Sequence, residues 1–104
     1  MTTFVVRRGE TIAWECEAGF DLTGWSVTST LRADVNEATA TPVLATFTVT
    51  VDAGSAGTFT LSQTAAETAA WTDGGVADIK FVSPSGAVEF SDVFSVRLVG
   101  TATR

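Results

Sequence analysis

The chain has 104 residues, enough for one domain with a single hydrophobic core that needs no disulfide or metal. Hydrophobic residues make up 45% of it, so its composition excludes an intrinsically disordered chain. The formal net charge of −6 argues against nucleic-acid binding, which needs a basic surface, and against docking on an anionic membrane.

The beginning of the chain carries no pattern of a secretory signal. The short apolar run Phe4–Val6 is followed at once by Arg7 and Arg8, and no apolar run approaches the ~20 residues of a membrane span. The single cysteine, Cys16, excludes an intrachain disulfide, as is usual in a reducing compartment. We therefore expect the protein to be made and folded in a cytoplasm, or to leave it by a route other than a cleaved signal.

Apolar and polar residues alternate with a period of two through most of the chain, which predicts strands with one wet face. Threonine fills many of the polar positions and suits a pleated, half-exposed surface. Turn residues, often glycine, separate the runs. Asp92 falls on the apolar parity of the last run, where it indicates a bulge or bend. Seven strands are predicted, over residues 3–7, 10–17, 25–33, 44–51, 57–62, 76–82 and 87–99.

One Ala-rich segment, residues 61–71, does not alternate. Thr64 and Glu67 have the spacing of a capping box, which predicts one short helical turn near 64–71. This turn would cross from one sheet to the other and close one end of the core with Trp71. Many strands joined by Gly-rich turns indicate a β-sandwich or barrel, so we expect an all-β fold with residues 1–104 forming a single domain.

The sequence offers little for catalysis. It has no His and no Tyr, and a Ser or Thr nucleophile needs an activating base. Lys80 lies on the polar parity of a strand and is interpreted as a solvated residue. The carboxylates are scattered over turns and wet faces, and nothing in their spacing pairs two of them across a cleft. The prediction is that the chain is not an enzyme and has no catalytic or cofactor-binding residue.

Two weaker candidates for chemistry have simpler interpretations. Asp34, Asn36 and Glu37 share one loop and could offer oxygen ligands to Ca²⁺, but the loop lacks the length and glycine of an EF-hand, so a polar turn is favoured and no metal site is predicted. Cys16 is flanked by Glu15 and Glu17 instead of basic residues, so it is interpreted as a small core hydrophobe and not as a reactive thiol.

The aromatic and basic residues have structural interpretations as well. Core packing explains the three tryptophans, Trp14, Trp25 and Trp71; an exposed sugar-stacking platform is the alternative. The arginines are spread along the chain and form no basic stripe in the sequence; they are Arg7, Arg8, Arg32, Arg97 and Arg104.

The stretch FDLTGW, residues 20–25, is a strong turn signal. Asp21 at the first position and Gly24 at the fourth fit a type I turn. Leu22 between them would tuck inward between two sheets. On these grounds alone the stretch predicts a corner of a β-sandwich.

Several short motifs follow one another in a familiar order. They are RRGET (7–11), FDLTGW (20–25), a strand ending in Leu31-Arg32, GTFTL (57–61), QTAAET (63–68) with Trp71, ADIKF (77–81), GAV (86–88) and FSVRL (94–98). This order resembles the small immunoglobulin-like domains of tailed-bacteriophage virions, including those labelled as the N-terminal domain of upper baseplate proteins. The resemblance covers nearly the whole chain.

The resemblance implies an antiparallel, immunoglobulin-like β-sandwich with a structural task in the virion, in the tail or baseplate, the neck or the head decoration. Such a domain acts by protein–protein assembly with other virion structural proteins, after synthesis in the host cytoplasm, and has no catalytic residues or cofactor. A homo-oligomer is open as well. Phe4–Val6 and the tail after Leu98 are candidate strand-pairing segments. The alternative is a carbohydrate- or host-receptor-binding β-sandwich module, which needs an exposed Trp in a concave site.

Overall fold

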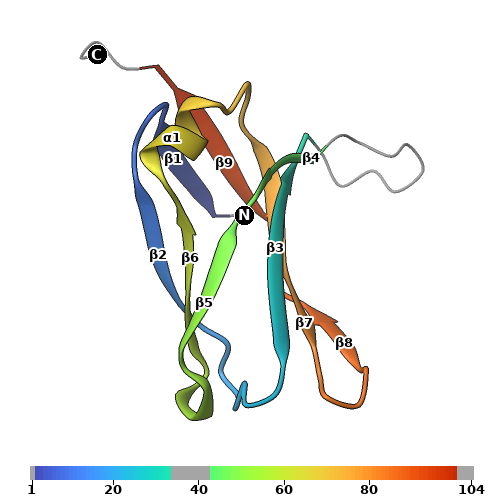
Figure 1. Cartoon of the computed structure of the whole chain (residues 1–104). Helices are drawn as coiled ribbons and strands as arrows, with labels where there is room; N and C mark the ends of the chain where they lie inside the picture. Colours follow the sequence, from blue (N-terminus) through green and yellow to red (C-terminus); the bar gives the residue numbers. More distant parts are fainter. Residues whose placement is uncertain (1, 34–42, 101–104) are drawn as a thin grey trace.

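The computed structural model describes residues 2–33 and 43–100, which form two β-sheets, one 3-10 turn and one short α-helix (Figure 1). The strands within these ranges are β1 (Thr3–Arg7), β2 (Ile12–Glu17), β3 (Ser26–Arg32), β4 (Val43–Thr46), β5 (Thr48–Ala53), β6 (Thr58–Gln63), β7 (Gly75–Val82), β8 (Val88–Phe90) and β9 (Phe94–Val99). The 3-10 turn η1 (Gly54–Ala56) follows β5, and the helix α1 (Ala65–Ala69) joins β6 to β7. The all-β prediction is confirmed.

The strands divide into a large and a small sheet. The large sheet has the order β1-β9-β7-β3-β4, with β8 paired beside β7, and the small sheet has the order β2-β6-β5. Every pair is antiparallel except β1 with β9, which run parallel. The expectation of a purely antiparallel arrangement is therefore wrong for this pair. Because β1 and β9 lie at opposite ends of the sequence, no hairpin fixes their relative direction.

The two sheets face each other across one core. Phe59 on β6 and Phe81 on β7 meet edge to face with their ring centroids 5.8 Å apart, so a contact joins the small sheet to the large one. Leu31 and Leu61 are 0% and 1% exposed. The alternation read from the sequence is thus the alternation between this core and the outer faces of the sheets.

Two of the seven predicted strands are each divided into two. The run 44–51 forms β4 in the large sheet and β5 in the small sheet, and the chain crosses between them at Phe47. The backbone N–H of Phe47 still donates to the Ser29 carbonyl at 3.0 Å. Its side chain is 4% exposed and points into the core from the crossing. Apolar and polar residues therefore still alternate across Phe47, and the sequence pattern does not show that the chain changes sheets there.

The last run, 87–99, is divided at the bend predicted from Asp92. β8 pairs with β7 over Lys80–Val82, and β9 pairs with β7 over Gly75–Ala77. Because β3 pairs with the opposite edge of β7, the strands β8 and β9 lie in succession along the same edge. The bend at residues 91–93 separates them.

The predicted helix is confirmed together with its capping box. The Thr64 hydroxyl accepts the Glu67 N–H at 3.1 Å, and the Glu67 carboxylate accepts the Thr64 N–H at 2.8 Å. The helix carries the chain from the small sheet to the large sheet. Trp71, which follows it, is 2% exposed and closes this end of the core, as expected.

The FDLTGW corner differs from its prediction by one residue. Leu22 is 2% exposed, so its predicted inward position is confirmed. The turn hydrogen bond, however, runs from the Trp25 N–H to the Leu22 carbonyl at 2.9 Å, and Gly24 has φ +77°. A positive φ at the third position is typical of a type II turn over 22–25, so the type I turn over 21–24 is wrong. Gly24 takes the position that needs positive φ instead of closing the turn.

Candidate functional site

The three tryptophans lie in the core or against it. Trp71 is buried, and its Nε1–H donates to the Gln63 side-chain oxygen at 3.3 Å. Trp14 is half-buried and stacks on Phe4 with ring centroids 4.6 Å apart. Trp25 is also half-buried and packs against Phe20 at 4.9 Å. Core packing is therefore confirmed for Trp71, while Trp14 and Trp25 pack at the margin of the core.

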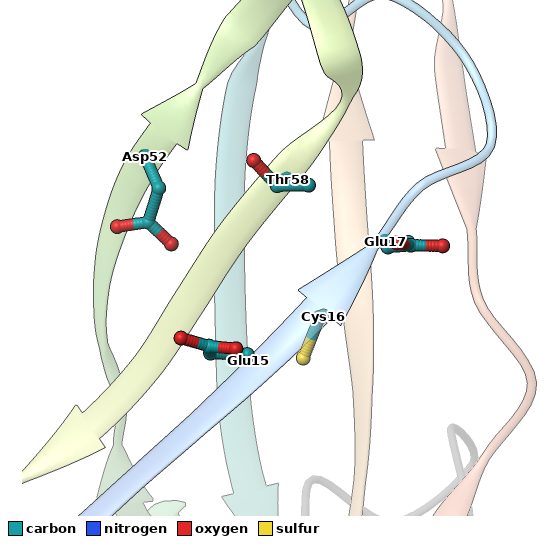
Figure 2. A pocket seen from close by; sticks show the side chains of 5 residues that line it. All are labelled: Glu15, Cys16, Glu17, Asp52 and Thr58. Atoms are coloured by element: carbon teal, nitrogen blue, oxygen red, sulfur yellow. The ribbon is translucent and has the colours of Figure 1, made fainter.

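The outer face of the small sheet carries a group of acidic and hydroxyl side chains. Glu15 pairs with Thr60 and Glu17 pairs with Thr58 in the β2–β6 ladder. A bulge in β5 between Val51 and Ala53 contains Asp52. These strands form a shallow depression of about 400 Å³ lined by Glu15, Cys16, Glu17, Asp52 and Thr58 (Figure 2).

The charged side chains that line the depression are all acidic. The Asp52 carboxylate accepts the Thr60 hydroxyl at 2.6 Å, and the three strands of this sheet contain no Lys or Arg. Within the described part of the chain, no set of three or more His, Cys, Asp or Glu side chains is arranged to hold a metal ion. The depression thus presents a negative surface instead of a ligand cage.

Cys16 lies at the edge of this depression with its side chain packed against the core. Its Sγ–H donates to the Trp14 carbonyl at 3.5 Å, and the residue is half-buried. Burial raises the pKa of the thiol above its ordinary value, which keeps it protonated at neutral pH. The interpretation of Cys16 as a packing residue agrees with these contacts. The loop that offered Asp34, Asn36 and Glu37 to Ca²⁺ lies outside the described residues.

The outer face of the large sheet carries the opposite charge. Four exposed cations occupy outward positions on four different strands; they are Arg7 on β1, Arg32 on β3, Lys80 on β7 and Arg97 on β9. Their chain neighbours Val6, Leu31, Ile79 and Val96 point into the core. The sheet therefore brings three of the scattered arginines onto one face with Lys80, whose predicted exposure is confirmed. On the described strands one carboxylate, Asp78, shares this face.

A short apolar edge borders the same sheet at β8. Val88 and Phe90 are 49% and 61% exposed. Hydrogen bonds join the Ser91 N–H to the Ile79 carbonyl and the Ser83 N–H to the Ala87 carbonyl. In such a ladder the peptide groups of Val88 and Phe90 point away from β7. Among the described residues no strand pairs with this side of β8, so the edge is open.

Sequence reasoning missed both charged faces. The outward parity of Glu15 and Glu17, or of Lys80 and Arg97, can be read from the alternation. The order of strands within a sheet cannot, and that order decides which charges become neighbours.

No protein-family model matches the chain, and a search of curated proteins finds no significant match. Neither helix in the described ranges is long and apolar enough to span a membrane.

Proposed function

We propose that the chain is an immunoglobulin-like β-sandwich domain that serves as a structural protein of a tailed-bacteriophage virion and acts by protein–protein assembly. The place of assembly would be the tail or baseplate, the neck or the head decoration. The observation that carries the proposal is the order of the strands in the two facing sheets, taken with the motif order described above.

The strand order supports an immunoglobulin-like topology. In immunoglobulin domains one sheet contains the strands B, E and D in that order, and the other contains G, F and C. Here the small sheet β2-β6-β5 corresponds to B-E-D, and β9-β7-β3 in the large sheet corresponds to G-F-C. The strand β4 extends the large sheet beside β3, as an additional strand does in variable-type domains.

Two hallmarks of antibody domains are replaced in this chain. The single cysteine cannot form the disulfide that joins the two sheets, and without tyrosine there is no tyrosine corner. Aromatic contacts join the two sheets instead, including Phe59 with Phe81, and Trp14 with Phe94 at 6.4 Å between ring centroids. A core of this kind needs no oxidising compartment, which agrees with assembly in a host cytoplasm.

Open strand edges support an assembly role. Among the described strands β1 pairs with β9 on one side only, and Val5 in its middle is 59% exposed. The predicted pairing segment Phe4–Val6 therefore keeps one free edge, and the open edge of β8 is a second one. Extended segments of other proteins can add to such edges through backbone hydrogen bonds.

Cryo-electron microscopy of particles from the source, with mass spectrometry of the same preparation, tests the proposal. We expect the chain among the particle proteins and a two-sheet domain of this size in defined density. Absence of the chain from purified particles would overturn the virion role. A glycan-binding screen would then test the alternative, a carbohydrate- or receptor-binding module.

A further inference from the structure

The two outer faces of this domain are electrostatic complements of each other. The small-sheet face carries the carboxylates Glu15, Glu17 and Asp52 on strands that contain no Lys or Arg. On the described strands, the large-sheet face carries four cations and one carboxylate, Asp78. The positive charge of the described strands is thus concentrated on one side of the core, and the small sheet presents only negative charge.

We propose that copies of this chain stack with the small-sheet face of one copy on the large-sheet face of the next. The inference rests on the assembly role proposed above and names a second copy as the partner. Such a contact is heterologous, because two different surfaces meet, so it propagates into a ring or a filament instead of ending at a dimer.

Charge complementarity favours this occupant over the alternatives. A contact between two like faces would set carboxylates against carboxylates or cations against cations, which costs several kcal/mol in an interface. A polyanion such as nucleic acid would match the large-sheet face alone and leave the acidic depression unused. Stacking of copies uses both faces, and the long cations Lys80 and Arg97 can reach into the shallow depression.

Because of the net charge of −6, whole copies of the chain repel each other. This repulsion acts over a longer distance than the attraction between the opposite charges that face each other in the contact. Two packed sheets are about 10 Å apart, so stacked copies would have their centres roughly 20 Å apart. At 0.1 M salt the screening length is about 10 Å, which weakens the repulsion between whole molecules more than the attraction between charges in contact. Association should therefore be visible near 0.1 M salt and lost near 1 M.

Two charge-reversal variants test the contact in solution. Glu15→Lys with Glu17→Lys makes both faces basic, and Lys80→Glu with Arg97→Glu makes both faces acidic. All four side chains are exposed, so both variants should keep the fold, which circular dichroism checks. In sedimentation velocity at 0.1 M salt we expect the wild type to associate with rising concentration. Each variant alone should dissociate at least about tenfold more readily.

Mixing the two variants gives the decisive measurement. The basic small-sheet face of the first variant fits the acidic large-sheet face of the second, so an equimolar mixture should associate again. The matched control, Glu89→Lys with Asp92→Lys, changes the net charge as much as the first variant but leaves the facing surfaces intact. It should associate at least as well as the wild type, because it lowers the overall repulsion.

Three results would overturn the inference: a wild type that stays monomeric at every concentration and salt, association that survives both reversals, or a mixture that fails to recover. A monomeric wild type that is still found in particles would overturn the stacking contact alone and leave the virion role standing. Absence of the chain from particles, together with the expected association in solution, would overturn the virion role and leave the stacking contact standing.

Discussion

The core is closed at its two ends in different ways. At the end where α1 lies (Figure 1), polar side chains make the closure. Gln63 is 4% exposed; its amide accepts from the Trp71 indole at 3.3 Å and donates to the Thr46 carbonyl at 2.7 Å. The buried Thr68 hydroxyl donates to the Glu10 carbonyl at 2.7 Å, and the Arg8 guanidinium donates to the Trp71 carbonyl at 2.7 Å.

At the opposite end, near η1, the backbone makes the closure. The Ala18 N–H donates to the Gly57 carbonyl at 2.8 Å, and the Leu22 N–H donates to the Gly54 carbonyl at 2.7 Å. Gly57 has φ +74°, and a Cβ added to it would lie 2.2 Å from the Phe20 carbonyl oxygen. Only a residue without a side chain allows the chain to approach this closely.

The difference predicts how each end responds to substitution. A side-chain hydrogen bond can be removed at the net cost of that bond and of any partner left unsatisfied. A close approach of two backbone segments cannot accept another atom unless the segments move apart. At the end near η1, Gly57 should therefore be the position least tolerant of substitution, although this end contains fewer buried polar side chains.

The largest expected effect is that of Gly57→Ala. The new Cβ would collide with the Phe20 carbonyl, and alanine disfavours the left-handed backbone by about 1–2 kcal/mol on its own. We expect a loss of at least about 3 kcal/mol in the free energy of unfolding, measured by urea titration. The matched control is Gly86→Ala, with φ +91° and nothing within 4 Å of its new Cβ. This variant should lose only the free energy that alanine costs in a left-handed backbone conformation. Equal losses in the two variants would contradict the role of the close approach.

The next effect, at the α1 end, is that of Gln63→Leu. It leaves the Trp71 indole N–H and the Thr46 carbonyl without their partner in a buried setting, which should cost about 2–3 kcal/mol. Trp71→Phe removes the indole N–H of the same bond, and the double variant should lose less than the two single losses combined. Strict additivity in thermal or urea unfolding would show that Gln63 and Trp71 contribute independently.

The sequence predicts these two ends unequally. The spacing of Thr64 and Glu67 predicts the helix and its cap, since a capping box depends on neighbours in the chain. FDLTGW predicts the inward Leu22, but the close approach of Gly57 to Phe20 depends on residues far apart in sequence. For the same reason the sequence did not predict the crossing at Phe47, the parallel pairing of β1 with β9, or the gathering of Glu15 and Asp52 on one face.

A smaller effect is expected from Thr64→Ala. The Thr64 hydroxyl accepts the Glu67 N–H at the start of α1, and losing such a cap costs about 1 kcal/mol. Thr72→Ala, at an exposed position after the helix, is the control and should change the stability little. If the capping variant unfolds at the same urea concentration as the control, the helix contributes less to this closure than its hydrogen bonds indicate.

The smallest effect belongs to an exposed side-chain acceptor of the FDLTGW corner, the Asp21 carboxylate. Hydrogen bonds from Thr23 lower the pKa of the exposed Asp21 carboxyl below its ordinary value. The Thr23 side chain has the larger effect and the Thr23 backbone N–H the smaller one. Because this pKa is lower in the folded chain, the ionised form adds stability above the unfolded value of about 3.9, and this stability disappears as the pH falls through the folded pKa.

Asp21→Asn keeps an oxygen acceptor without the charge. The difference in thermal stability between the wild type and this variant should therefore be small, constant above about pH 5, and diminished below pH 4. An NMR titration of the Asp21 carboxyl measures the folded pKa directly. If the carboxyl titrates at the unfolded value, the corner is closed by its backbone alone.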